Sequence, residues 1–276
     1  LDANTTADNN TAVGADSLKA NTTGAENVAL GSTALDANTI GCRGVAIGYN
    51  AMGANTDGNF NTAVGRSALS TNTTGDNNVS VGYSSLQNST TSSNNTSVGM
   101  ESMFLNTTGA NNTAMGLCSL RANTTANNNT AVGVSALTTN TTGDRNTATG
   151  RGALNFNTTG ACNSGHGMYS LYNNSTGSTN VAVGTCSLFT NTTASCNTAV
   201  GFCSLYANTT GCINVAVGFQ AMKANTTGEF NTAIGAGSLQ TNTTGGENVS
   251  SGYNSLALNT TGCKNTAFGK SSLEAN

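Results

Sequence analysis

A five-residue block, Asn-Thr-Ala-Val-Gly or a close variant, returns every 17 residues along this chain. The block starts at Asn10 and again at Asn27, and its register is kept without insertion or deletion to Asn265. A short fixed period is the signature of a repeat architecture, in which each unit packs only on its neighbours. This period constrains the fold more than any other feature, and it argues against most enzyme folds.

We number the repeat from its opening asparagine, so that Gly14 is at position 5, Leu18 at position 9 and Asn21 at position 12. Position 9 is Leu or Met in every copy from Leu1 to Leu273. Only 8% of the residues are charged, and a polar composition of this kind is typical of disordered chains. A disordered chain has no reason to keep an apolar residue in step, so we expect an ordered fold.

One repeat is too short for a pair of helices, because helical repeats of the familiar kinds need about 33 to 47 residues. Thr-Ala-Val and Val-Ala-Val runs favour β-strands, and Asn-Thr-Thr-Gly favours a turn. We therefore predict an all-β fold, a parallel β-solenoid (β-roll or β-helix) of about sixteen 17-residue rungs. Residues one repeat apart are expected to stack about 4.8 Å from each other.

Residues 1–276 show no change of composition, so we expect a single continuous repeat array. The sequence starts in the middle of a repeat and shows no atypical repeat that would cap a solenoid. We therefore expect it to be a window of a longer fibre.

The identities allowed at each position predict which side chains are buried. Position 5 is always Gly, positions 3 and 8 hold only small residues, and position 9 supplies one large apolar side chain per rung. Position 4 is mostly apolar but tolerates Thr149, His166 and Ser251, and along a strand it points away from position 3. Either this second apolar face contacts another chain, or the roll is monomeric and both columns share one core.

Position 12 carries most of the Asn-x-Ser/Thr acceptor motifs for N-linked glycans. The same column keeps its asparagine at Asn38 and Asn55, which lack the acceptor hydroxyl. There are two alternatives: outward side chains that carry sugar, or inward side chains that form a hydrogen-bonded ladder. The candidate glycosylation sites are Asn4, Asn21, Asn72, Asn106, Asn123, Asn140, Asn157, Asn174, Asn191, Asn208, Asn225, Asn242 and Asn259.

Eight cysteines occur, but no Cys-x-x-Cys pair or Cys/His cluster that would hold a metal. Cys186 and Cys203 share a position in consecutive rungs, and Cys196 and Cys212 are diagonal neighbours. These two pairs are candidate disulfides. The alternative is that the cysteines are small side chains filling ordinary positions.

Catalytic residues, metal ions and cofactors are not expected. His166 is the single histidine and has no predicted partner for catalysis, so we interpret it as a packing residue. The net charge of −3 shows no clustering, so nucleic acid is not an expected partner. No apolar run approaches the roughly 20 residues of a membrane span.

Rows of threonine and of aromatic residues are the remaining candidates for binding. Threonine rows on a β-solenoid suggest ice binding, but adjacent threonines of a strand point to opposite faces, so we expect only one outward row at positions 13 and 14. Tyr172, Phe189 and Tyr206 occupy consecutive rungs. They either stack on each other or present a row that binds sugar or a neighbouring fibre.

The unit N-T-A-V-G-x-x-A-L-x-x-N-T-T-G resembles repeats of phage and viral tail-fibre proteins and of surface-fibre proteins. It is more loosely similar to the head repeats of trimeric autotransporter adhesins. The resemblance implies parallel β-roll fibres of three chains that display adhesive tips.

We therefore expect a non-enzymatic structural protein that forms an extracellular fibre or fibre shaft on a virion or cell surface. Its partner is expected to be itself, as a homo-oligomer, with covalent glycans if the position 12 motifs are used. The main alternative is an adhesin or tail-fibre module whose sides recognise glycans, and ice binding is a minor alternative.

Overall fold

The computed structural model describes residues 2–275 and contains no helix in that range. It divides into two compact units, one ending at Thr142 and the other beginning at Gly143. The strands of the first unit are β1 (Thr11–Val13), β2 (Val28–Leu30), β3 (Val45–Ile47), β4 (Thr62–Val64), β5 (Val79–Val81), β6 (Thr96–Val98), β7 (Thr113–Met115) and β8 (Thr130–Val132). Those of the second are β9 (Thr147–Thr149), β10 (Ser164–His166), β11 (Val181–Val183), β12 (Thr198–Val200), β13 (Val215–Val217), β14 (Thr232–Ile234), β15 (Val249–Ser251) and β16 (Thr266–Phe268).

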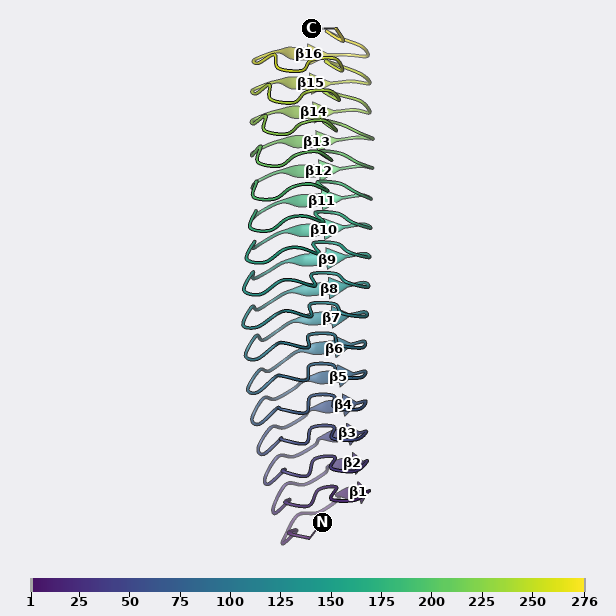
Figure 1. Cartoon of the computed structure of the whole chain (residues 1–276), viewed down its shortest axis with the longest axis vertical. Helices are drawn as coiled ribbons and strands as arrows, with labels where there is room; N and C mark the ends of the chain where they lie inside the picture. Colours follow the sequence, from purple (N-terminus) through teal and green to yellow (C-terminus); the bar gives the residue numbers. More distant parts are fainter. Residues whose placement is uncertain (1, 276) are drawn as a thin grey trace. The chain divides into compact units, whose positions relative to one another are not determined.

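Within each unit, every strand pairs in parallel with the strand of the next repeat (Figure 1). Thr11 lies opposite Val28 and Val13 opposite Leu30, so the register is one full repeat. The same register joins β9 to β10 and the later strands of the second unit. One repeat therefore forms one rung of a parallel β-solenoid, and the predicted fold class is confirmed.

The core of each rung is thin and is made by positions 3, 8 and 9. Position 9 is at most 1% exposed in every copy from Leu18 to Leu256, and the Ala or Ser side chains at position 8 lie beside it. Small residues here let the walls of the roll approach closely, which leaves space for one Leu or Met per rung. The prediction of a buried column is wrong for Leu273, which is 49% exposed beyond β16, and Leu1 lies outside the described residues.

The glycine at position 5 is required for two reasons. Its φ is positive, 129° at Gly14 and 142° at Gly252, in a region that side chains rarely adopt. A Cβ added to Gly14 would also lie 2.6 Å from the carbonyl carbon of Gly31 in the next rung. The positive φ returns in every later copy, and the close approach returns at Gly31, Gly48 and Gly65 but not at Gly269, which has no following rung beside it.

Three further positions adopt the left-handed conformation, and among them glycine occurs only at Gly152 and Gly237. Position 9 has φ near 50° although it holds Leu or Met, and positions 7 and 17 have similar values, as at Asp16 and Glu26. Each such residue costs on the order of 1 kcal/mol relative to the right-handed region. Burial of the position 9 side chain offsets this cost, and the left-handed turn aims that side chain into the core.

Candidate functional site

The asparagines at position 12 lie inside the roll and form a hydrogen-bonded ladder. Asn38 Nδ2 donates to Asn21 Oδ1 of the preceding rung at 2.7 Å and to the carbonyl of Gly41 at 2.9 Å. Both amide hydrogens are therefore used within the core. Among the candidate glycosylation sites, those from Asn21 to Asn259 are at most 1% exposed, and only Asn4 is exposed.

The inward orientation is the same with and without an acceptor motif. Asn55, which lacks the motif, donates to Asn38 Oδ1 at 2.9 Å, and Asn72, which has it, donates to Asn55 Oδ1 at 2.8 Å. A sugar on any of these nitrogens would replace a hydrogen that is donated inside the rung. The side chains thus have the geometry of the inward, hydrogen-bonded ladder. Attachment of a glycan would require this ladder to open.

A second ladder runs through the asparagines at position 1. The backbone N–H of Asn27 donates to Asn10 Oδ1 at 2.9 Å, and Asn27 Nδ2 donates to the carbonyl of Gly41 at 2.8 Å. Each asparagine therefore holds its own rung to the rungs on both sides. The near-invariance of this column results from that double role.

The position 12 ladder is interrupted once in the first unit, at Ser89. Asn72 Oδ1 is buried and has no hydrogen-bond partner, because Ser89 has no amide to donate to it. The Ser89 hydroxyl is hydrogen-bonded to that of Ser92, which stands where most repeats have Gly. Ser92 Oγ then accepts from Asn106 Nδ2 at 3.2 Å, so the serine pair replaces the acceptor of the missing asparagine but not its donor.

A third column of cross-rung hydrogen bonds, at position 16, was not predicted from the sequence. Side chains there accept the backbone N–H of the same position one rung earlier, as in Cys42 N–H to Asn59 Oδ1 at 2.9 Å and Ser178 N–H to Ser195 Oγ at 3.0 Å. Residues at this position are chemically varied, including Asn, Asp, Ser and Cys, which hides the shared role. This column could have been found from the sequence, because most residues at position 16 carry a hydrogen-bond acceptor.

Three of the eight cysteines belong to this column. Cys42, Cys212 and Cys263 accept a backbone N–H of the preceding rung through sulfur, at 3.3 to 3.4 Å. Cys212 therefore has a role that needs no disulfide, and its candidate partner Cys196 contacts Thr179 Oγ1 at 3.5 Å.

Cys186 and Cys203 lie at position 7 of consecutive rungs as free thiols. Burial raises the pKa of both thiols, and the neighbouring Cys203 raises the pKa of Cys186 further. For Cys203, Lys223 and the hydrogen bond with Cys186 act in the opposite direction. The structure thus brings this candidate pair together as two adjacent thiols. Because their pKa values are raised, both thiols stay protonated to a higher pH than an ordinary cysteine.

The outward side chains at positions 2, 4 and 6 form what we call the strand face. Of the 27 large apolar residues that are exposed in the described part of the chain, 19 lie at these three positions, so exposed apolar area gathers on one face of each unit. Tyr49, Leu30 and Met115 belong to it in the first unit, and Phe219 and Ile234 in the second. The only charged residues at these positions are Arg66, Arg151 and Lys270.

The aromatic residues stack on one another. The rings of Tyr172 and Phe189 are 5.2 Å apart and nearly parallel, and so are those of Phe189 and Tyr206. Phe156 and Tyr169 also meet Tyr172 edge-on, each at 5.1 Å. Because ring faces are used in these contacts, this row presents mainly ring edges to solvent.

His166 is held within its own chain through both ring nitrogens. Nδ1 lies 2.7 Å from Thr149 Oγ1 in the preceding rung, and Nε2 lies 3.1 Å from Ser164 Oγ. No group of His, Cys, Asp and Glu in the described residues is arranged to hold a metal ion.

In most rungs the two threonines of Asn-Thr-Thr differ in exposure, and only the second of them is exposed. Thr22 is half-buried and Thr23 exposed, because this segment bends at a corner and does not alternate as a strand does. The Thr22 hydroxyl donates to the carbonyl of Thr39 at 2.9 Å.

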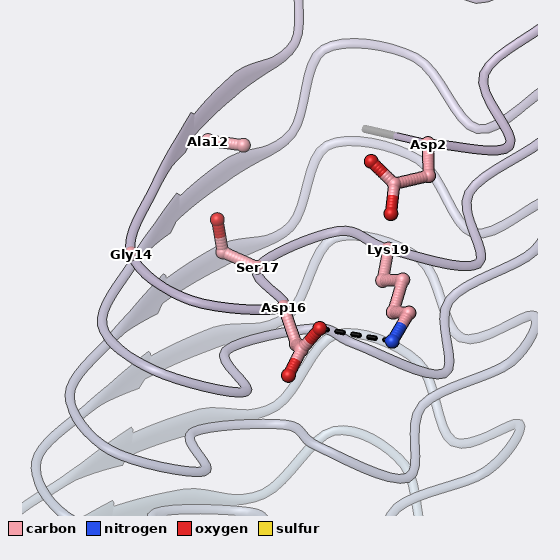
Figure 2. Close-up of a pocket in the computed structure, with 6 residues that line it drawn as sticks. All are labelled: Asp2, Ala12, Gly14, Asp16, Ser17 and Lys19. Atoms are coloured by element: carbon pink, nitrogen blue, oxygen red, sulfur yellow. Dashed lines mark hydrogen bonds and ion pairs between the residues drawn. The ribbon is translucent and has the colours of Figure 1, made fainter.

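A pocket of about 270 Å³ lies at the first turn, beside the edge of β1 (Figure 2). Its lining includes Asp2, Ser17 and an exposed ion pair, Lys19 Nζ to Asp16 Oδ1 at 2.9 Å. Asp16 and Lys19 therefore neutralise each other at the edge of this pocket.

No helix in residues 2–275 is long and apolar enough to cross a membrane.

No known family model matches the chain, and neither a curated protein nor a solved structure matches it. Its function therefore has to be inferred from its own surfaces.

Proposed function

We propose that this protein is a non-enzymatic structural element, a segment of an extracellular fibre or fibre shaft that associates laterally with copies of itself. The observation that carries this proposal is the strand face. It has a concentration of exposed apolar side chains, with aromatic residues and Met among them, which is the composition of an interface core.

A second copy of the chain is the partner that fits this face. Any second copy presents the same columns at the same rung spacing, so apolar side chains meet along the whole length of contact. A partner without the period would match only locally. By resemblance to fibre repeats, we propose three parallel chains.

Two polar residues of the strand face make contacts within the chain, and His166 is the one that is hydrogen-bonded, which supports burial of the face. His166 has hydrogen bonds at both ring nitrogens, and Arg66 lies between the rings of Tyr49 and Tyr83, 5.8 Å from each centroid. Burying a polar group that has partners costs far less than burying one without.

Sedimentation equilibrium of the purified chain tests the proposal. We expect a homo-oligomer for the natural sequence and a monomer for the double variant Val217→Lys, Ile234→Lys, because unpaired charges would be buried in the contact. The matched control is Thr210→Lys, Thr227→Lys at position 14, which adds the same charge to exposed residues outside the strand face.

A monomeric natural chain, or a position 4 double variant that associates like its control, would contradict the proposal. Far-ultraviolet circular dichroism of each variant shows whether the solenoid is intact. Recognition of glycans by the sides of the fibre is the second candidate. It is less favoured because Tyr172, Phe189 and Tyr206 pack their ring faces on each other.

A further inference from the structure

Position 4 is the column of the strand face in which polar residues are rarest. In the first unit every copy from β1 to β8 is aliphatic or Met. In the second unit three copies are polar, Thr149 in β9, His166 in β10 and Ser251 in β15, whereas β11 to β14 carry Val or Ile. We call Thr149, His166 and Ser251 the register set.

Self-association of identical rungs has an inherent ambiguity. If one copy slides along another by one rung, about 4.8 Å, every column falls on itself, and most position 4 side chains still meet an aliphatic neighbour. An array with a uniform face would therefore associate in several registers of similar free energy. The same problem in coiled coils is solved by a single polar residue in an otherwise apolar seam.

The spacing of the register set removes this ambiguity. His166 lies one rung after Thr149, Ser251 lies five rungs after His166, and therefore six after Thr149. Because these three separations all differ, any shift brings at most one polar member against another. All three members face their own equivalents only when the two copies are aligned without a shift. In every shifted alignment, at least two members of each copy face residues outside the set, most of which are aliphatic.

The contacts within the chain make the set suitable for burial. Thr149 Oγ1 and His166 Nδ1 are 2.7 Å apart and link β9 to β10, and Ser164 Oγ holds Nε2 at 3.1 Å. The imidazole is thereby fixed in one orientation at the surface of the sheet. These two contacts use only part of the hydrogen-bonding capacity of the Thr149 and Ser164 hydroxyls, because a hydroxyl donates once and accepts twice. A polar neighbour can therefore still bond there, whereas an aliphatic neighbour cannot.

We infer that Thr149, His166 and Ser251 determine the axial register of parallel copies that pack through the strand face. The inference rests on the proposed self-association, and it adds which position 4 residues distinguish one alignment from another. The partner is a second copy of this chain in the same orientation.

Photo-crosslinking of the full chain tests this inference. A benzophenone amino acid replaces Val200 at position 4, and light and heavy-isotope chains are mixed, so that only mixed crosslinks report contacts between copies. We expect the natural sequence to crosslink within one rung of position 200 in its partner. The triple variant Thr149→Val, His166→Val, Ser251→Val should spread the crosslinks over several rungs, with a roughly fivefold rise in the fraction outside that range.

The matched control is Thr198→Val, Thr232→Val, Thr266→Val. It removes three hydroxyls at position 2, where valine already occurs in Val181, Val215 and Val249. We expect this control to keep the natural crosslink pattern. Sedimentation equilibrium of each sample shows whether the chains associate.

The outcomes separate the two proposals. If the natural chain is monomeric, both the self-association and the register inference fail. If all samples associate and the triple variant keeps the confined pattern, the self-association stands and the register inference is overturned. If the control spreads its crosslinks as widely as the triple variant, hydroxyls in general and not the register set decide the alignment, which also overturns it.

Discussion

Asn38 Nδ2 lies 2.7 Å from Asn21 Oδ1, although only Asn21 belongs to a glycosylation motif. The two asparagines occupy the same place in consecutive rungs, and the motif is lost at Asn38 because Ile40 stands where Thr23 stands in the preceding rung. The ladder therefore explains why asparagine occurs at this position even where no glycan can be attached. The role of the ladder can be tested separately from that of the motif.

Replacing Asn191 by Ala is expected to lower the free energy of unfolding by about 1–3 kcal/mol, because it removes two buried donors and leaves Asn174 Oδ1 unpaired. Thr193→Ala destroys the same motif but keeps the asparagine, so a change within roughly 0.5 kcal/mol is expected. Denaturant unfolding measures both. Equal losses in the two variants would show that the ladder is not the reason for the asparagine.

Restoring the regular ladder at its interruption is expected to stabilise the first unit. The double variant Ser89→Asn, Ser92→Gly supplies the missing donor to Asn72 Oδ1 and should raise the free energy of unfolding by about 1 kcal/mol. Each single variant should do less, since Ser89 and Ser92 are hydrogen-bonded to each other. A double-mutant cycle in chemical denaturation measures the coupling, and additive single effects would contradict it.

The cross-rung acceptor at position 16 predicts the effect of changing Ser195. Ser195→Ala leaves the N–H of Ser178 without its 3.0 Å acceptor and should cost roughly 1 kcal/mol. Ser195→Cys should cost less, because Cys212 accepts the equivalent N–H in the next rung at 3.4 Å. If cysteine and alanine were equally destabilising in thermal unfolding, sulfur would not act as an acceptor in this column.

Strain at position 17 predicts a stabilising substitution. Ile213 is β-branched, half exposed and held at φ 57°, whereas asparagine occupies the same place at Asn77, Asn94 and Asn111. Ile213→Asn is expected to gain about 0.5–1 kcal/mol, since asparagine tolerates the left-handed region. The matched control is Ile47→Asn on the strand, where φ is not left-handed and no such gain is expected. Differential scanning calorimetry checks the sign.

The thiols of Cys186 and Cys203 predict a pH dependence. Burial raises the pKa of both in the folded chain, so folding favours their protonated form. Their contribution to stability is complete below the pKa of the unfolded thiol and is lost as pH rises through the folded value, above roughly pH 8.5. Cys186→Ser, Cys203→Ser should weaken the alkaline loss seen in urea unfolding, and an unchanged pH profile would refute the assignment.

Oxidation of the same pair gives a separate measurement. The candidate disulfide predicts that mild oxidation removes two hydrogen atoms and joins peptides that contain Cys186 and Cys203. Peptide mass mapping detects this link. A link between Cys196 and Cys212 instead would require Cys212 to give up its hydrogen bond with Ser195 N–H.

The sequence by itself determined the rung, because an unbroken period of 17 residues leaves one way to stack identical short strands. Leu18 and its equivalents, and the small residues at positions 3 and 8, predicted the core, since packing restricts residue identity most where space is smallest. These are local and repeated constraints, which a single chain displays many times over.

Only the tertiary structure decided which way a side chain points at a corner. Asn21 turns inward and Thr23 outward because the chain bends between them, and the alternation rule for strands does not apply there. The cross-rung partners of Asn59 and Cys212, and the hydrogen bonds that join His166 to Thr149 and Ser164, likewise depend on rungs being stacked in space. A hydrogen bond needs an acceptor at a particular distance and angle, and several residue types meet that need equally well, so the sequence shows no single signal for it.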